Sequence, residues 1–261
     1  MANAGDVLLA ERSGGVVTLT LDRPDQFNAL SEELLDALQD ALAGIARDED
    51  ARCVVLAANG RAFCAGHDLK QMRSKPDHGY YRQLFQQCGQ VMQSIVSLPV
   101  PVIARVHGTA TAAGCQLVAS CDLAVAADAA RFAVSGINVG LFCSTPAVAL
   151  TRNVAAKKAF EMLVTGEFIS AQDARDNGLV NHVVPLDELD AKVAELVSAI
   201  CAKSPLAVRT GKSMFQRQRG MQLADAYDYA AGVMAQNRMA EDVAEGIDAF
   251  MQKRHPVWKG R

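Results

Sequence analysis

Two glycine-containing turns carry residues whose types and spacing suit chemistry on a small molecule. The first is "GRAFCAGHDLKQM" (60–72), after the apolar run 53–58, and the second is "VHGTATAAGCQL" (106–117), after the apolar run 102–106. Each turn places backbone N–H groups at the end of a buried strand, the second at a helix start, where unpaired N–H groups attract negative charge. Two such donors that converge on one oxygen form an oxyanion hole, in which one donor is typically worth ~10²–10³ in rate.

One polar side chain, that of Gln116, stands in the first turn of the helix that follows the second glycine-containing turn. An amide does not titrate, so Gln116 cannot act as a general acid or base, although it can hydrogen-bond to a water or an acyl oxygen. Cys115 and Cys143 would be nucleophiles only with a base beside them, and the sequence places none there.

Hydrophobic periodicity predicts the elements that position these turns. Val17, Leu19 and Leu21 alternate with threonines, which indicates a half-buried strand, and Ser31 is a suitable cap for the helix that follows. Further strands are predicted over 53–58, 102–106, 122–126, 132–134 and 180–184, and further helices over 81–95, 114–120 and 170–178. This alternation favours an α/β core with largely parallel strands, whereas only helical periodicity remains after residue 186.

The composition is that of an ordinary globular protein, with 50% hydrophobic and 21% charged residues and a net charge of −3. No basic cluster indicates nucleic acid, no apolar run approaches the ~18 residues of a membrane span, and the first residues do not resemble a secretory signal. Seven irregularly spaced cysteines indicate reduced thiols rather than disulfides or a metal site. We therefore expect a cytoplasmic protein without a metal, a nucleic-acid partner or a membrane anchor.

Several segments resemble the crotonase superfamily, which shares the enoyl-CoA hydratase/isomerase fold. "RAFCAGHDL" is similar to the superfamily's Phe-x-Ala-Gly-x-Asp-Leu turn, and "LTLDRPDQFNALS" is similar to its first-strand signature. "PVIARVHGTATAAGCQLVASCDLAVAAD" and "TGEFISAQDARDNGLVNHVVP" resemble later segments, so the resemblance covers nearly the whole chain. "GLFCSTP" (140–146) resembles a divergent branch of the superfamily.

The resemblance implies a spiral of ββα turns that forms an acyl-CoA-binding core over residues 1–200. It implies a C-terminal helical region over 201–261 that makes trimer contacts, giving a homotrimer or a dimer of trimers. Coenzyme A would enter as part of an acyl thioester substrate, with no covalently bound cofactor. The oxyanion donors carried over by position are the N–H groups of His67 and Ala113. The substrate-binding residues around them would be Ala65, Gly66, Asp68, Leu69, Lys70 and Gly114.

Several side-chain roles near these donors stay open. The ring of His67 is either solvated or part of the pocket wall, and Asp68 is expected to cap a helix rather than to catalyse. Lys70 is a candidate for a coenzyme phosphate. So are three residues near the C-terminus, which otherwise form a solvated basic tail: Lys253, Arg254 and Lys259.

The chain departs from the superfamily where acid/base chemistry is expected. The two glutamates of the hydratase correspond to Gln116 and Gly136, and an acid or base is typically worth ~10²–10⁴ in rate, so we expect weak hydratase activity. Ala113 stands where glycine is usual and would be strained if its φ were positive. Ser144 is expected to be an N-cap rather than a nucleophile.

Two classes of function follow from this pattern. The first is an enzyme of the enoyl-CoA hydratase/isomerase type that stabilises an enolate, or one that decarboxylates or hydrolyses a thioester with water held by Gln116. The second is a non-catalytic protein that binds acyl-CoA. A carboxylate near Gln116, such as that of Asp173 or Glu161, would restore an acid/base mechanism.

Overall fold

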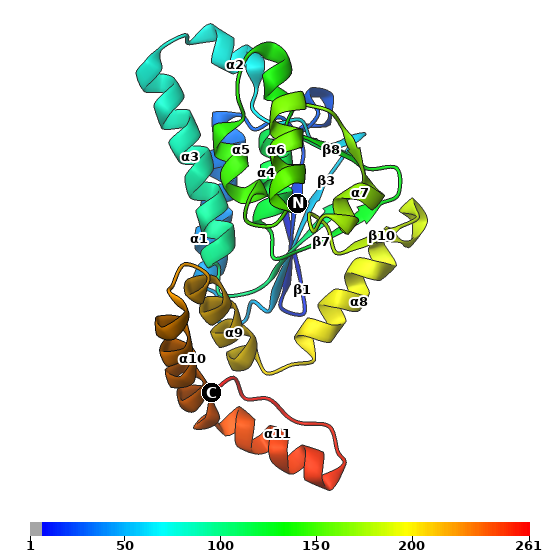
Figure 1. Cartoon of the computed structure of the whole chain (residues 1–261). Helices are drawn as coiled ribbons and strands as arrows, with labels where there is room; N and C mark the ends of the chain where they lie inside the picture. The colour runs from blue at the N-terminus through cyan, green and yellow to red at the C-terminus, as the bar shows by residue number, and fades with distance from the viewer. Residues whose placement is uncertain (1–6) are drawn as a thin grey trace.

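Two β-sheets form the core of the computed structural model, which describes residues 7–261 (Figure 1). The strands of the larger sheet lie in the order β1 (Leu8–Ser13), β2 (Val16–Leu21), β3 (Cys53–Ala58), β5 (Val102–Val106), β7 (Leu123–Ala127) and β10 (His182–Val184). Those of the smaller sheet lie in the order β4 (Ala62–Cys64), β6 (Thr109–Thr111), β8 (Arg131–Ala133) and β9 (Ile169–Ser170). The β1–β2 and β8–β9 pairs are antiparallel, and the other neighbouring pairs are parallel.

The chain passes repeatedly from the larger sheet to the smaller sheet and then into a helix. β3 and β4 are followed by α2 (Leu69–Ser74) and α3 (His78–Ser97), and β5 and β6 by α4 (Ala113–Ser120). β7 and β8 are followed by the 3-10 helix η2 (Ser135–Val139) and by α5 (Ser144–Leu150). This order confirms the expected α/β class with a ββα spiral. Because β4, β6 and β8 are parallel neighbours, their carboxyl ends meet at one edge of the smaller sheet.

The remaining elements are the other helices of the chain. They are η1 (Pro24–Gln26), α1 (Glu32–Ala46), α6 (Ala156–Thr165), α7 (Ala171–Asp176), η3 (Leu186–Glu188), α8 (Leu189–Cys201), α9 (Pro205–Gln218), α10 (Leu223–Arg238) and α11 (Glu241–Gln252). α1 begins at the predicted cap, since Ser31 accepts a hydrogen bond from the N–H of Leu34. α7 begins with a capping box between Ser170 and Asp173. The predicted N-cap at Ser144 is wrong by one residue, because Cys143 occupies the cap position of α5.

The main hydrophobic core lies between the larger sheet and helices α1, α3 and α4. α1 contributes a buried stripe that includes Leu34, Leu38 and Leu42, while every residue of α4 is buried. A second cluster, which includes Ile103, lies on the other face of the sheet beneath α8. Because both faces of the parallel strands are covered, β3 and β5 read as the continuous apolar runs seen in the sequence.

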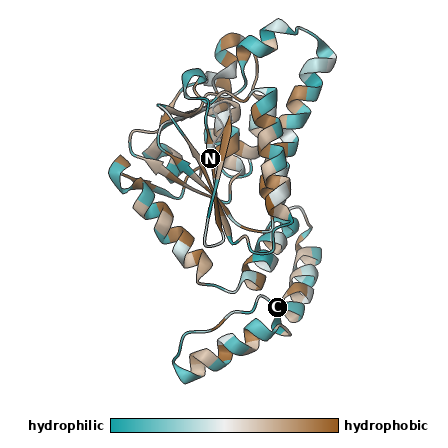
Figure 2. Cartoon of the chain, turned by 180° about the vertical axis from the view of Figure 1, so that it is seen from behind, coloured by the Kyte–Doolittle hydropathy of each residue, from teal (hydrophilic) through white to brown (hydrophobic). Residues whose placement is uncertain are grey.

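The C-terminal helices leave the sheets at the end of the molecule opposite to α2 (Figure 1). α9 is attached through the buried Lys212, whose ammonium donates to Asp122 Oδ2 at 2.6 Å and to the carbonyls of Ile95 and Val100. α10 and α11 carry many exposed apolar side chains, and Figure 2 shows apolar positions scattered along them. Among residues 7–261, no helix is long and apolar enough to cross a membrane.

Candidate active site

The turn after β4 aims the N–H of His67 away from the sheet. Leu30 forms a parallel bridge with His67, in which the N–H of Leu30 donates to the Gly66 carbonyl at 2.7 Å and the N–H of Asp68 donates to the Leu30 carbonyl at 3.2 Å. In a parallel bridge the central residue directs its own N–H to the opposite side. Within the described part of the chain, nothing accepts a hydrogen bond from the N–H of His67.

Asp68 holds this turn in place, as the capping interpretation predicts. Its Oδ1 accepts from the N–H groups of Lys70 and Gln71 at 3.1 Å, and its Oδ2 accepts from the Arg23 guanidinium at 3.1 Å. Arg23 also donates to the carbonyl of Ala29. Burial alone would raise the pKa of Asp68, but these hydrogen bonds and the Arg23 charge outweigh it and hold the pKa below its usual value.

The turn after β6 presents the N–H of Ala113 at the start of α4. Ala112 has φ 51° and ψ −122°, so the strain expected at Ala113 lies one residue earlier. The N–H of Ala112 donates to the carbonyl of Ala133 at 3.0 Å, which fixes the turn to β8. The first N–H groups of a helix have no partner within it, and among residues 7–261 no carbonyl accepts from Ala113.

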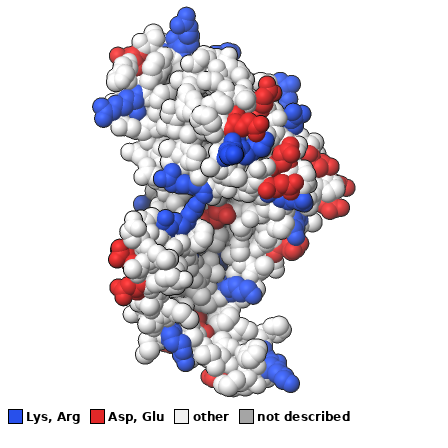
Figure 3. Space-filling model, in the orientation of Figure 1, with Lys and Arg blue, Asp and Glu red and all other residues white. Residues whose placement is uncertain are grey.

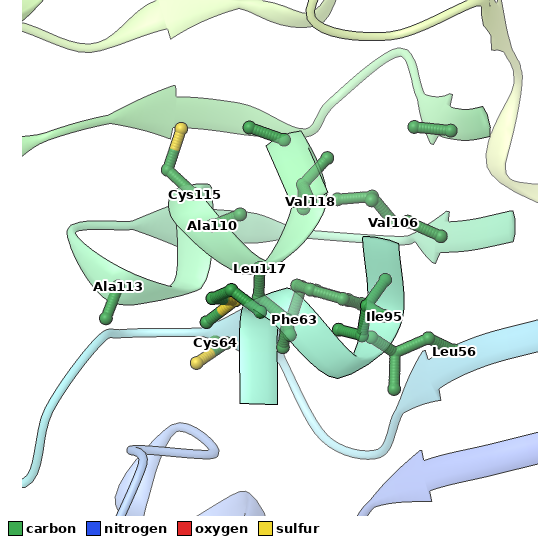
Figure 4. Close-up of a cluster of buried hydrophobic side chains, with 14 of the residues drawn as sticks. Leu56, Phe63, Cys64, Ile95, Val106, Ala110, Ala113, Cys115, Leu117 and Val118 are labelled. Atoms are coloured by element: carbon green, nitrogen blue, oxygen red, sulfur yellow. The ribbon is translucent and has the colours of Figure 1, made fainter. Parts of the chain in front are cut away.

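The two turns are in direct contact because glycines stand where they meet. A Cβ atom on Gly114 would lie 2.1 Å from the Cys64 carbonyl oxygen, so only glycine lets α4 approach β4 this closely. A Cβ atom on Gly66 would lie 3.2 Å from the Ala113 nitrogen. Figure 4 shows Ala113 at the start of α4 and Cys64 nearby, with the helix packed on buried apolar side chains. The structure thus brings the two predicted donors together.

A cavity of about 490 Å³ opens at this meeting point. Of the predicted residues, those on its wall are Ala65, His67, Asp68, Leu69, Lys70 and Ala113, whereas Gly66, Gly114 and Gln116 do not line it. The remaining wall is largely apolar and includes Phe27, Met72, Phe85, Val139, Leu141 and Phe142. A cavity of this kind, with a few polar groups at one point, is typical of a small-molecule site.

The carboxylates that were expected to replace the missing glutamates do not line the cavity. Its acidic residues are Asp25 and the capping residue Asp68. Gln116 is 4% exposed, and its Oε1 is buried without a hydrogen-bond partner. Neither Asp173, which caps α7, nor Glu161, which pairs with Lys158, lies on the wall. Neither predicted replacement is therefore within the cavity, and Asp25 is the acidic residue on its wall that does not cap a helix.

Gly136 lies on the cavity wall where the second glutamate of the superfamily was expected. A Cβ atom there would stand 2.7 Å from the sulfur of Cys143 and 2.7 Å from the carbonyl oxygen of Leu141. The space for a side chain at this position is therefore occupied. Burial raises the pKa of Cys143, and within the described chain no base faces its thiol, so it is not an activated nucleophile.

His67 lies on the cavity wall, and both nitrogens of its imidazole are buried rather than solvated. Its ring packs edge-on against Phe85, with ring centroids 5.3 Å apart and planes at 65°. Burial lowers the pKa of His67 to about 4, an effect that the nearby Leu30 carbonyl offsets only in part. The ring is therefore neutral at physiological pH.

The basic residues proposed for coenzyme phosphates are divided between the two ends of the molecule. Lys70 is exposed at the cavity. Arg254 and Lys259 pair with Glu245 and Glu241 in the C-terminal region, far from α2. Figure 3 shows charges of both signs scattered over the face in view. Within one chain, only Lys70 of the predicted basic residues is therefore placed to meet a ligand in this cavity.

Two residues at the site were missed by sequence reasoning. No role was predicted for Arg23, although its guanidinium holds Asp68. Asn28 is fully buried with φ 54°, and its side chain joins Arg23, Asn59 and Ala62 through hydrogen bonds. An asparagine just before a capped helix is a known signal for left-handed backbone, and it could have identified this anchor.

Comparison with known proteins agrees with this geometry. The sequence model of the enoyl-CoA hydratase/isomerase family matches residues 11–261. The chain belongs to this family. A crystal structure described as enoyl-CoA hydratase from Mycobacterium smegmatis is 59% identical, with a TM-score of 0.96, over 97% of this chain and 99% of that one. The crotonase fold expected from the sequence motifs is thereby confirmed.

The divergent branch suggested by "GLFCSTP" is also confirmed. A protein of Xenopus laevis named enoyl-CoA hydratase domain-containing protein 3, mitochondrial, is 46% identical over 95% of this chain and 84% of its own length. The crystal structure of the human enoyl-CoA hydratase domain-containing protein 3 is 45% identical, with a TM-score of 0.94, over 97% of this chain and all of that one.

The expectation of a cytoplasmic location is wrong by the same comparison. The relative from Xenopus laevis is named as mitochondrial, and so are the matching proteins of Rattus norvegicus, Mus musculus and Homo sapiens. The expectation depended on reduced cysteines and on the first residues of the chain, neither of which distinguishes one reducing compartment from another.

Proposed function

We propose that the protein binds acyl thioesters of coenzyme A and stabilises negative charge on the thioester oxygen. The N–H groups of His67 and Ala113 are the donors that hold this oxygen. The observation that carries the proposal is that two N–H groups with no acceptor among residues 7–261 meet at one apolar cavity, one of them at a helix start. Donors fixed in this way stabilise an enolate without reorganising during the reaction.

The same cavity supports charge stabilisation better than hydration. Hydration of an enoyl thioester needs a base for water and an acid for carbon, and the positions expected to supply them hold Gln116 and Gly136. We therefore propose that the protein acts on acyl thioesters through its oxyanion hole, with hydratase activity far below that of an enzyme that keeps both carboxylates.

Calorimetric titration with three ligands tests the binding proposal. Butyryl-CoA has the thioester oxygen, its thioether analogue lacks that oxygen, and free coenzyme A lacks the acyl chain. Two hydrogen bonds to the oxygen should make butyryl-CoA bind about tenfold more tightly than the thioether. Equal affinities for the two would contradict an oxyanion hole, and the coenzyme A control separates it from binding through the phosphates.

We further propose that the C-terminal helices join copies of the chain, as a homotrimer or a dimer of trimers. Apolar side chains on this region are unusually exposed, at 86% for Phe250 and 82% for Met239. Patches of this kind mark interaction surfaces. Light scattering on the wild-type chain and on a Met239→Asp, Phe250→Asp variant tests this: a trimer or hexamer that the variant loses is expected, and a wild-type monomer would contradict it.

A further inference from the structure

Both ring nitrogens of His67 are buried and lack a hydrogen-bond partner within residues 7–261. A neutral imidazole carries one N–H donor and one acceptor nitrogen. Buried polar atoms are usually paired, and an exception calls for an explanation such as a catalytic role or a bound group. The Leu30 carbonyl near the ring can accept from one nitrogen at most, and because His67 lies on the cavity wall, a bound ligand can supply a partner for the other once the ring turns.

The ring can turn a nitrogen into the cavity without moving the backbone. The torsion between Cβ and an aromatic ring is broad, so rotation of the imidazole costs little. Phe85, which the ring meets edge-on, lines the same cavity, as does Met72, an unbranched and adaptable side chain. The N–H of His67 keeps its direction during this rotation because the bridge to Leu30 fixes it.

The surroundings favour an uncharged partner for this ring. Burial keeps the imidazole neutral, and Asp68, the adjacent acid, is already bonded to Arg23 and to helix N–H groups. A charged group placed beside a neutral ring in an apolar wall would lose its hydration without a counter-charge. A hydroxyl or a keto oxygen pairs with a neutral imidazole at a much smaller desolvation cost.

We propose that the imidazole of His67 determines acyl specificity by hydrogen-bonding to a hydroxyl or keto oxygen on the carbon two bonds from the thioester carbonyl carbon. The inference rests on the proposed function, because the N–H of the same residue would hold the thioester oxygen. The ring nitrogens are covalently close to the N–H of the same residue, so the acyl oxygen that they meet must stand close to the thioester oxygen, as an oxygen on that carbon does. His67 would thus hydrogen-bond to the substrate through both its backbone N–H and its ring.

Calorimetric titration of four proteins with three ligands tests the proposal. Butyryl-CoA lacks the second oxygen, and each enantiomer of 3-hydroxybutyryl-CoA carries it. His67→Phe keeps the aromatic ring and the backbone N–H and removes both nitrogens, whereas His67→Gln returns a donor and an acceptor. His78→Phe makes the same change at an exposed position at the start of α3.

We expect the wild-type protein to bind one 3-hydroxybutyryl-CoA enantiomer about tenfold more tightly than butyryl-CoA. His67→Phe should reduce this preference, taken as the ratio of the two affinities of the same variant, to about onefold. His67→Gln should recover part of the preference, and His78→Phe should keep all of it. The imidazole ¹⁵N signals of the wild-type protein should shift with 3-hydroxybutyryl-CoA and not with butyryl-CoA, which a structural role would not produce.

Three outcomes separate the two proposals. A preference that persists in His67→Phe overturns the role of the ring, and so does a wild-type protein that binds all three ligands equally. Failure of the wild-type protein to bind butyryl-CoA overturns the proposed function itself. Thermal melts of all variants, read beside their butyryl-CoA affinities, show whether a loss of preference comes from misfolding.

Discussion

Gly114 packs so closely on Cys64 that a Cβ atom added to the glycine would stand 2.1 Å from the Cys64 carbonyl oxygen. This contact joins α4 to β4, and with them the two turns that present the N–H groups of His67 and Ala113. Backbone atoms cannot move aside as a flexible side chain can, so a methyl group at this position must push the turns apart.

Gly114→Ala is therefore expected to lower the free energy of unfolding by about 3 kcal/mol and to weaken butyryl-CoA binding. Denaturant unfolding and calorimetry measure the two effects. Gly211→Ala is the matched control, since Gly211 lies exposed in α9 with nothing near its Cβ position, and it should be neutral or stabilising. A Gly114→Ala protein as stable as the control would show that the turns are not held by this contact.

Gly136→Glu should not create hydratase activity, although it places a carboxyl group where the superfamily has one. Its side chain would collide with the Cys143 sulfur and the Leu141 carbonyl, each 2.7 Å from the new Cβ atom. We expect a loss of stability and crotonyl-CoA hydration no faster than in the wild-type protein. Hydration that rises a hundredfold in this variant would mean that the cavity wall rearranges freely.

Arg23→Met should weaken the site because Asp68 loses a hydrogen-bond donor, and not because a contact with the ligand is lost. The variant loses the donors to Ala29 and Asp68, leaves that carboxylate partly buried, and should cost about 1–3 kcal/mol of stability. Arg12→Met is the control, because the pair of Arg12 with Asp48 is solvent-exposed and should contribute little to stability. Equal losses in the two variants, measured by urea unfolding, would count against a positioning role for Arg23.

The burial of His67 predicts a dependence of stability on pH. Its pKa in the folded protein is about 4, below its ordinary value of 6.5, so the unfolded chain binds more protons between these values. Stability should therefore fall as the pH drops from 6.5 toward 4. Between pH 6.5 and 5, His67→Phe should lose about 1–2 kcal/mol less than the wild-type protein, since the carboxylates titrate in both. Parallel stability curves for the two proteins would show that the ring is solvated.

The larger sheet was predictable from sequence because its central strands are buried on both faces. β3 and β5 coincide with the predicted runs 53–58 and 102–106. The edge strand β1 was missed, since four of its six residues are exposed and give no alternation. β4, β6 and β9 were missed because strands of two or three residues are too short to show an alternation of apolar and polar residues. Their pairing with neighbouring strands is what identifies them.

At the site, local chemistry was predictable and long-range contact was not. The cap formed by Asp68 depends only on the next three residues, so the sequence indicates it. The burial of the His67 ring depends on Phe85, which α3 brings across from a later part of the chain. The strain at Ala112 was placed one residue too far along, because the exact turn geometry depends on its hydrogen bond to Ala133 in β8.

The central claim is that the N–H of Ala113 stabilises an enolate, and Ala113→Pro replaces that N–H with a ring methylene that cannot donate. Ala113 is the first residue of α4, where proline is common, but the positive φ of Ala112 is unfavourable before a proline, so thermal melts must show that the variant is folded. Ala156→Pro makes the same change at the exposed start of α6. The enolate of acetoacetyl-CoA absorbs in the near ultraviolet, so a pH titration of its absorbance follows ionisation when it is bound.

The wild-type protein and Ala156→Pro should lower the pH at which bound acetoacetyl-CoA ionises by about one unit or more relative to the free thioester. Ala113→Pro should bind coenzyme A and lose most of this shift. An Ala113→Pro protein that binds acetoacetyl-CoA and ionises it at the wild-type pH would contradict the oxyanion hole.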